Sequence, residues 1–147
     1  MNDFRRAMLY PVTTTTLALA AVITLAAWRH GNADPYAITT AAFGRQPWRI
    51  LTSILAHGDF MHILFNALWA WQIGPVIEAR FGTARTAAIF LGTGITSSLA
   101  EYAFLYGGIG LSGIGYGLLG MGVVLTRHDR RLFGFLDRRT ISYFIFW

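Results

Sequence analysis

The sequence predicts an all-α fold, a polytopic bundle of transmembrane helices with four full spans and the start of a fifth. Two observations predict it. Of the 147 residues, 54% are hydrophobic and only 13% are charged, whereas a soluble domain carries about 25% charged residues. The hydrophobic residues also gather into uncharged runs that are separated by arginines. This composition excludes a disordered chain and does not fit an ordinary soluble globule.

The first predicted span is Leu9–Trp28, a run of twenty residues without a charge. At about 1.5 Å per residue, twenty helical residues cross a hydrocarbon core of about 30 Å. Pro11 falls in the first turn, where a missing N–H costs little. A helical Thr can return its hydroxyl to a backbone carbonyl, so Thr13–Thr16 are compatible with the span. A cleaved signal peptide is the alternative, because Arg5 and Arg6 precede the run.

Three further apolar runs, each predicted to be a span, are Phe60–Ile77, Thr86–Tyr106 and Gly113–Thr126. Thr140–Trp147 begins another apolar run, but eight helical residues reach only about 12 Å, less than half a bilayer. We therefore expect one membrane domain, residues 1–147, that is incomplete at its C-terminal end and stops inside a fifth span. A short interfacial anchor is the alternative for this last run.

Arginine placement predicts the orientation of the chain. All twelve basic residues are arginines, and nine of them flank the same ends of the predicted spans: Arg5, Arg6, Arg80, Arg85, Arg127, Arg130, Arg131, Arg138 and Arg139. By the positive-inside rule this side is the cytoplasm. We therefore expect a multi-pass cell-membrane protein with a cytoplasmic N-terminus, and a bacterial inner membrane is a fair guess. The 31-residue external connection Arg29–Asp59 should lie along the membrane interface.

Composition also excludes some partners and chemistries. There are no cysteines, which removes disulfides, thiolate metal sites and cysteine nucleophiles together. The arginines sit between apolar runs and do not cluster on one polar face, so no nucleic-acid partner is expected. The lipid bilayer is the expected surrounding.

The second predicted span contains His62 and Asn66, which are four residues apart and share one helix face. Such groups are costly in lipid, so this face should point at protein or water. A hydrogen bond that joins two helices is the plain alternative to a functional role. His57 lies near the expected outer interface and could simply be solvated. A metal site built from His57 and His62 lacks a third ligand at any familiar spacing, so no metal is expected.

The fourth predicted span, Gly113–Thr126, has fourteen residues and reaches only about 21 Å. Its helix should therefore begin below the membrane surface, with Ser112 at its start. A helix N-terminus presents unpaired N–H groups that suit a developing oxyanion, so Ser112 is a candidate nucleophile. Ser is also a preferred N-cap, and the glycines of this helix could serve only close packing. The residues alone leave both interpretations open.

Two segments together resemble the rhomboid intramembrane serine proteases. The first contains His57, His62 and Asn66 in the order His-Gly-Asp-Phe-Met-His-Ile-Leu-Phe-Asn, and the second is Gly-Leu-Ser-Gly-Ile-Gly-Tyr from Gly110 to Tyr116. The similarity covers about Trp48 to Thr126. Beside these motifs, the resemblance implies structural roles for Trp48, Arg49, His57, Glu78 and Arg80.

The resemblance implies the following roles. Ser112 would be the nucleophile, and its backbone N–H would help to bind the oxyanion. Asn66 and His62 would donate to that oxyanion from the second span. Gly113 would let the substrate backbone approach, and Tyr116 would pack against the ring of the catalytic histidine. The substrates would be transmembrane segments of other proteins, and no cofactor is implied.

The sequence departs from the family at the general base. In rhomboid proteases this base is a histidine on the sixth span, and no residue here fills that role. His128 is excluded because sixteen helical residues put it about 24 Å from Ser112; His62 stays open as a substitute. We therefore expect the 147-residue chain to be inactive. The alternatives are a non-catalytic rhomboid-like protein that binds transmembrane clients, and a small transporter or pore subunit whose pathway includes Glu101.

Overall fold

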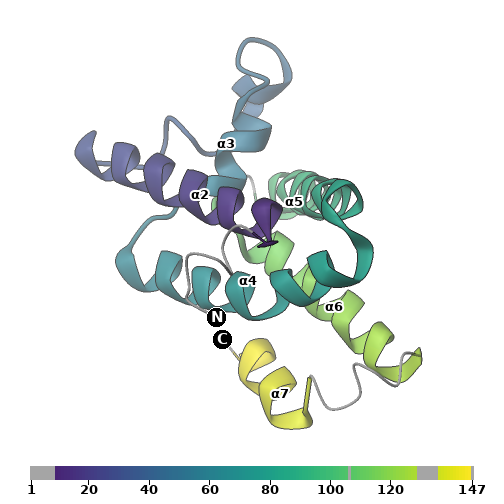
Figure 1. Cartoon of the computed structure of the whole chain (residues 1–147). Helices are drawn as coiled ribbons and strands as arrows, with labels where there is room; N and C mark the ends of the chain where they lie inside the picture. The colour runs from purple at the N-terminus through teal and green to yellow at the C-terminus, as the bar shows by residue number, and fades with distance from the viewer. Residues whose placement is uncertain (1–8, 106, 129–135, 147) are drawn as a thin grey trace.

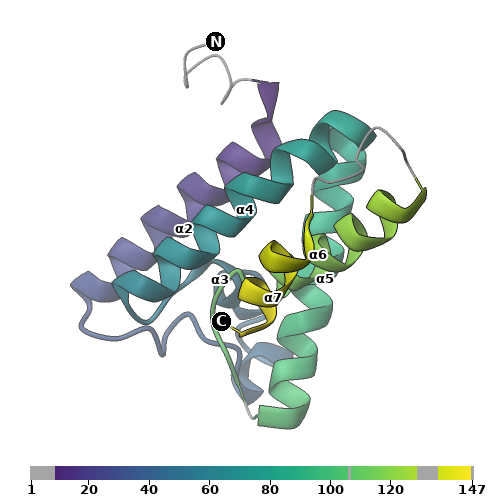
Figure 2. The ribbon, with the colours of Figure 1, turned by 90° about the horizontal axis from the view of Figure 1, so that it is seen from below.

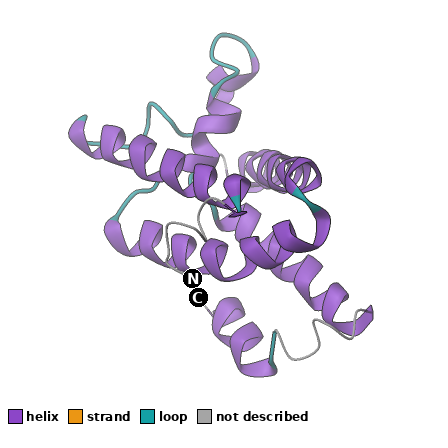
Figure 3. Cartoon of the chain, viewed as in Figure 1, coloured by secondary structure: helices purple, strands orange, loops and turns teal. Residues whose placement is uncertain are grey.

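The chain folds into helices joined by loops (Figures 1 and 3). The computed structural model describes residues 9–105, 107–128 and 136–146, and no strand occurs among them. The helices are α2 (Pro11–Arg29), the 3-10 helix η1 (Thr40–Phe43), α3 (Arg49–Leu55), α4 (Phe60–Phe81), α5 (Thr83–Leu105), α6 (Ser112–His128) and α7 (Arg138–Phe146). The predicted all-α class is confirmed.

Three helices, α2, α4 and α5, are long and apolar enough to cross a membrane. They correspond to the first three predicted spans, with ends that differ by a few residues. Helix α6 has 17 residues and α7 has nine, so at about 1.5 Å per residue they measure about 26 Å and about 14 Å. The count of four full spans plus the start of a fifth therefore stays a prediction.

The N-terminal end of α2 is held by a carboxylate of α4, which runs beside it (Figures 1 and 2). The first backbone N–H groups of a helix have no partner within the helix, and the N-cap residue Tyr10 supplies no side-chain bond. Glu78 supplies the missing acceptors from 65 residues away. Its two carboxylate oxygens accept from the Val12 N–H at 2.9 Å and the Thr13 N–H at 3.0 Å. The Thr13 hydroxyl also donates to Glu78 at 3.0 Å, where the sequence had suggested a bond to a backbone carbonyl.

Helix α4 has clear signals at both ends. The Asp59 side chain accepts from the His62 N–H at 2.9 Å and caps the first turn. At the other end Gly82 has φ +78°, the left-handed conformation that glycine adopts most easily, and its N–H bonds to the Glu78 carbonyl. The cap at Asp59 sets the start of α4 and therefore the position of His62, and the end at Gly82 sets the position of Glu78.

Helices α5 and α6 pack closely because small residues line their contact. A Cβ atom added at Gly117 would overlap the Thr93 side chain, and one at Gly94 would overlap Ile54 of α3. Around this contact, the core is formed by buried aliphatic and aromatic side chains of α2 to α7 and of the loops before α6 and α7: Ala20, Ile54, Ile73, Ile77, Phe90, Leu111, Ile114, Leu118, Leu119, Leu136 and Phe144. The helix that starts at Ser112 is thus set rigidly against α4 and α5.

The connection between α2 and α4 is structured by η1, α3 and one arginine. Arg49, in the first turn of α3, donates through Nη1 to the Asp34 carbonyl at 2.9 Å and to the Ala37 carbonyl at 3.3 Å. Phe43 and Trp48 leave more than half of their surface exposed. Exposed aromatic side chains suit a membrane interface, and the placement of this connection along that interface stays a prediction.

The first test concerns Glu78. Glu78→Gln replaces one acceptor oxygen with an NH₂ group that faces the donors of α2, so a buried N–H loses its partner. We expect a destabilisation of about 1 to 3 kcal/mol, measured as a lower thermal unfolding temperature of the detergent-solubilised protein. The exposed carboxylate variant Asp34→Asn is the control and should unfold with the wild type. Equal unfolding temperatures for all three proteins would contradict the capping role.

Candidate active site

The site is built where the α3–α4 turn, the first turns of α4 and the loop before α6 meet. His57 lies in the turn and is fully buried, so the sequence-based suggestion that it is solvated is wrong. Its Nε2 accepts the Leu111 N–H at 3.2 Å, and its Nδ1 lies 3.0 Å from the Leu55 carbonyl. Since a backbone N–H can only donate, Nε2 carries no proton and the Nδ1–H donates to Leu55.

Helix α2 also takes part in holding His57. The Thr24 hydroxyl lies 3.2 Å from Nδ1 of His57, and the Trp28 indole N–H donates to the His57 carbonyl at 3.1 Å. Burial lowers the pKa of His57 to about 4, with a further lowering by His62, against smaller opposing effects of the Leu55 carbonyl and Asp59. His57 is therefore a neutral positioning group that ties three segments together, and it does not face the serine cavity described below.

The loop before α6 depends on glycine. Gly110 has φ +120°, in the region that favours glycine, and its N–H donates to the Ser53 carbonyl at 2.7 Å. A Cβ atom added at Gly110 would lie 2.7 Å from Nε2 of His62. Only a residue without a side chain lets this loop pass so close to His62, and the loop in turn places Ser112 as the first residue of α6.

One cavity of about 350 Å³ brings the predicted site residues together. It lies between α4, α6 and α7, which adjoin one another in Figures 1 and 2, and it is lined by Asp59, Met61, His62, Asn66, Ser112, Tyr116 and Phe144. Ser112 is partly exposed, and no described residue gives its hydroxyl a hydrogen bond. Its N–H belongs to the first turn of a helix, where backbone donors have no intrahelical partner. The cavity thus joins a hydroxyl, an imidazole and a carboxamide.

Asn66 and His62 are coupled within α4. The Asn66 carboxamide donates through Nδ2 to the His62 carbonyl at 2.8 Å, one turn back along the helix. The rings of His62 and His57 meet edge to face, with centroids 4.8 Å apart. Asn66 therefore lines the cavity beside Ser112 while one of its two N–H groups is already engaged.

Tyr116 and Gly113, for which the resemblance implies roles at the substrate, contact other parts of the protein in the structure. The Tyr116 ring packs against Phe144 of α7 at 4.9 Å, and its hydroxyl donates to the Phe144 carbonyl at 3.4 Å. The expected contact of Tyr116 with a catalytic histidine is not formed with any described histidine. Gly113 faces Ser97 of α5, where an added Cβ would overlap the serine side chain. Gly113 thus permits close packing of α5 and α6.

The remaining predicted residues lie outside the cavity. Glu78 caps α2, and the Arg80 guanidinium lies over the Phe81 ring at 5.5 Å. Arg49 holds the external connection, and Trp48 precedes it at the start of α3. His128 is the exposed last residue of α6, at the opposite end of the helix from Ser112.

Sequence reasoning missed Thr24, Ser53 and the backbone of Leu111 as partners of this site. Thr24 sits inside an apolar run, and a polar residue in a span is the one available signal. Nothing in the sequence identifies His57 as its partner 33 residues away. The Leu111 and Ser53 contacts use backbone atoms, which carry no residue-type signal.

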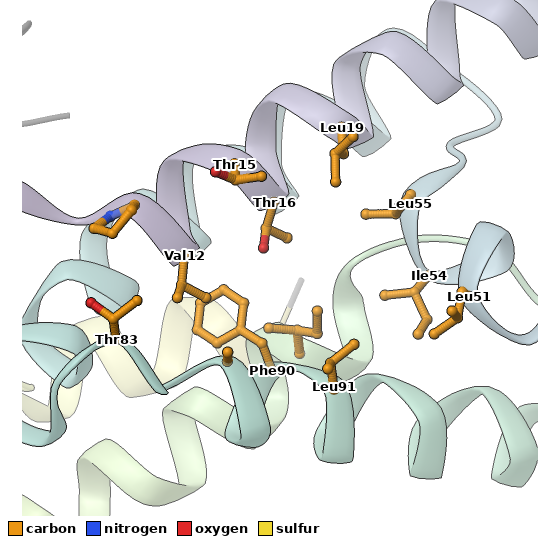
Figure 4. Close-up of a pocket in the computed structure, with 13 residues that line it drawn as sticks. Val12, Thr15, Thr16, Leu19, Leu51, Ile54, Leu55, Thr83, Phe90 and Leu91 are labelled. Atoms are coloured by element: carbon orange, nitrogen blue, oxygen red, sulfur yellow. The ribbon is translucent and has the colours of Figure 1, made fainter. Parts of the chain in front are cut away.

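No site for a metal is found in the described ranges, where no three His, Asp or Glu side chains come together. A larger cavity of about 480 Å³ lies between α2, α3 and α5 (Figure 4). Its described lining is aliphatic and aromatic apart from threonine hydroxyls, for example Val12, Leu19 and Phe90, and no titratable side chain is found among these residues.

The chain is similar to proteins of one family over most of its length. The family model described as Rhomboid domain matches residues 44–147. The chain is 37% identical over 87 residues to rhomboid protease GluP of Bacillus subtilis (strain 168), which covers 58% of this chain and 17% of that protein. It is 30% identical over 124 residues to rhomboid protease GlpG of Enterobacter sp. (strain 638), covering 82% of this chain and 41% of that protein. It is 32% identical over 138 residues to the putative rhomboid protease YdcA of B. subtilis, covering 86% and 68%.

The pKa of His57 predicts how stability depends on pH. Folding lowers this pKa from 6.5 to about 4, so the unfolded chain binds the proton more readily, and the contribution of neutral His57 is complete above pH 6.5. It is lost as the pH falls from 6.5 towards 4, because a protonated Nε2 would face the Leu111 N–H. We expect the thermal unfolding temperature in detergent to fall over this interval.

The variant His57→Gln isolates this effect from other titrating groups. Its unfolding temperature should be lower at neutral pH, because the Leu111 contact is changed, and should depend less on pH between 6.5 and 4. A variant with the same pH slope as the wild type would rule out His57 as the responsible group.

Proposed function

The chain belongs to the rhomboid family, and from that premise we propose that it supplies the nucleophile and the oxyanion-binding groups of an intramembrane serine endopeptidase. The observation that carries the proposal is the shared cavity of Ser112, His62 and Asn66 at the N-terminus of α6. The curated relatives are rhomboid proteases, and the chain spans 17% and 41% of two of them. The activity of the whole protein therefore belongs to the proposal.

The proposed reaction is acyl transfer. The Ser112 Oγ attacks the carbonyl carbon of the scissile peptide bond, and its proton passes to a general base. The oxyanion is held by the Ser112 N–H and by donors from His62 and Asn66. When the C–N bond breaks, the base returns the proton to the amine that leaves. Water then hydrolyses the ester between Ser112 and the substrate, which restores the hydroxyl.

The general base is the part that the described residues do not supply. We propose that it is a histidine on a helix outside these 147 residues, as in the family pattern. His62 is the substitute, since it lines the cavity with Ser112. The partial positive charge of the α6 N-terminus disfavours this role, because a base that takes the proton of Ser112 becomes a cation. The space beside Tyr116, which Phe144 occupies here, is where we expect the missing imidazole to enter.

The proposed substrates are transmembrane segments of other membrane proteins. A segment must unwind near small or helix-breaking residues before its backbone can reach Ser112, because a regular helix keeps its carbonyls in internal hydrogen bonds. We place the N-terminus in the cytoplasm from the distribution of the arginines. The cavity would then open towards the outer half of the bilayer.

One observation favours a second candidate, a non-catalytic rhomboid-like protein that holds transmembrane clients. In the described part of the chain, the Ser112 hydroxyl has no base within hydrogen-bond distance, and the Asn66 carboxamide bonds within its own helix. In a client-binding protein, Ser112→Ala would leave client retention unchanged. In a protease, the same variant would accumulate uncut substrate.

The roles in the cavity predict different losses of activity in the full-length protein. Ser112→Ala removes the attacking oxygen and should abolish cleavage of a transmembrane reporter in liposomes. Asn66→Ala removes one oxyanion donor and should lower kcat by about 10² to 10³ while leaving measurable cleavage. Asn66 would be structural if both variants lost cleavage completely and Asn66→Ala also lost thermal stability while Ser112→Ala did not.

The missing base predicts a difference between two forms of the protein. The 147-residue chain should cleave at least about 10⁶-fold more slowly than a longer product of the same gene that includes a histidine-bearing helix, because a serine without its base loses that much in subtilisin. Single-turnover cleavage of one reporter by both forms measures this ratio. Equal rates would contradict an external base and would favour His62.

A further inference from the structure

A second cavity reaches Ser112 from the side of α5. It has a volume of about 510 Å³ and is open at the surface, and this volume lies within the range of about 300 to 1,000 Å³ of small-molecule pockets. Ser112 and Tyr116 line both this cavity and the one shared with His62. A substrate chain attacked at Ser112 can therefore place one neighbouring side chain on the α5 side.

The lining of this α5-side cavity is small and polar, with one charged group. Helix α5 contributes Thr93, Thr96 and Ser97, and α6 contributes glycines beside Ser112. Glu101, one turn after Ser97 on the same face of α5, is the only carboxyl group among the lining residues that the structure describes. Among the described lining residues there is no arginine or histidine to balance its charge.

Glu101 has no counter-charge in the described part of the chain. Its side chain is half-buried and packs against the backbone of Gly108, and no described residue forms a hydrogen bond or ion pair with it. An ionised carboxylate only accepts hydrogen bonds. A carboxylate in a membrane-spanning helix that lacks an internal partner is expected to face a ligand or a pathway.

The backbone of α5 adds to the negative potential at this place. Helix α5 ends at Leu105, one turn after Glu101, and its last turn contains no basic residue. The C-terminus of a helix carries a partial negative charge that favours cations. Two features of the described residues, a carboxylate without a partner among them and a helix end without a basic residue in its last turn, therefore favour a cation in the α5-side cavity.

We infer that Glu101 selects substrates that carry a basic side chain beside the peptide bond attacked by Ser112. The inference rests on the proposed function for the position of that bond. Arginine suits the site best, because its guanidinium binds a carboxylate through two parallel hydrogen bonds. Glu101 acts on binding and specificity, and it takes no part in the transfer of the acyl group.

The test uses transmembrane peptides rich in Leu and Ala with a Gly–Ser break near the outer end. Arg, Gln or Glu is placed in turn at each position flanking the break. Binding is measured first, to the full-length Ser112→Ala protein in liposomes, so that the result does not depend on cleavage. We expect one position at which the Arg peptide binds roughly 10-fold more tightly than the Gln peptide and the Glu peptide binds most weakly.

Two variants then assign the preference to Glu101. Adding Glu101→Gln should bring the Arg-to-Gln affinity ratio to about one, and adding Glu101→Arg should make the Glu peptide the tightest binder. Asp34→Asn, which removes a carboxylate from the external connection, should keep the wild-type ratio. A ratio of one before any change at Glu101, or a ratio that survives Glu101→Gln, would overturn the inference.

The same peptides separate this inference from the proposed function. With Ser112 intact, kcat/KM for cleavage should follow the binding order, through KM more than through kcat. Failure to cleave any peptide would contradict the protease function, and the affinity ratios would still decide the role of Glu101. Cleavage with no charge preference in either assay would overturn the role of Glu101 and leave the protease function standing.

Discussion

The hydrogen bond from the Leu111 N–H to Nε2 of His57 is the contact on which the site depends. Its donor is the residue before Ser112, and its acceptor belongs to a ring whose other nitrogen, Nδ1, is held by the Leu55 carbonyl and the Thr24 hydroxyl. The bond requires a neutral imidazole, and burial keeps it neutral. The position of Ser112 therefore depends on α2, on the end of α3 and on the turn before α4, and of these only the turn, through Asp59, is among the described lining of the serine cavity.

The opposite end of α2 shows the same principle. Polar groups that would be costly in lipid form hydrogen bonds with residues far away in the sequence. Each of these bonds fixes how two segments lie against each other. Glu78 satisfies the first N–H groups of α2, while Thr24 and Trp28 attach its other end to His57. Helix α2 thus aligns α4 at both ends, and α4 presents His62 and Asn66 towards α6.

Much of the fold was predictable because span length and apolar composition are strong local signals. The sequence located α2, α4 and α5, and it placed Ser112 at the start of a short helix and His62 with Asn66 on one face. It failed on His57, since a lone histidine beside a polar turn gives no sign of burial. The partners of His57 are a threonine 33 residues earlier and a backbone N–H 54 residues later, and such distances exceed what residue patterns encode. The contact of Tyr116 with Phe144 also depends on tertiary packing alone.

The central claim is that Ser112 faces a hydrated cavity beside His62 and Asn66, and thiol labelling tests it most directly. The chain has no cysteine, so Ser112→Cys introduces a single reactive group, and Val124→Cys places the same group on the exposed face of α6. Both proteins are treated in membranes with a charged, water-soluble thiol reagent. Rapid labelling of Ser112→Cys with little labelling of Val124→Cys is the predicted result, and equally slow labelling of both would contradict the account.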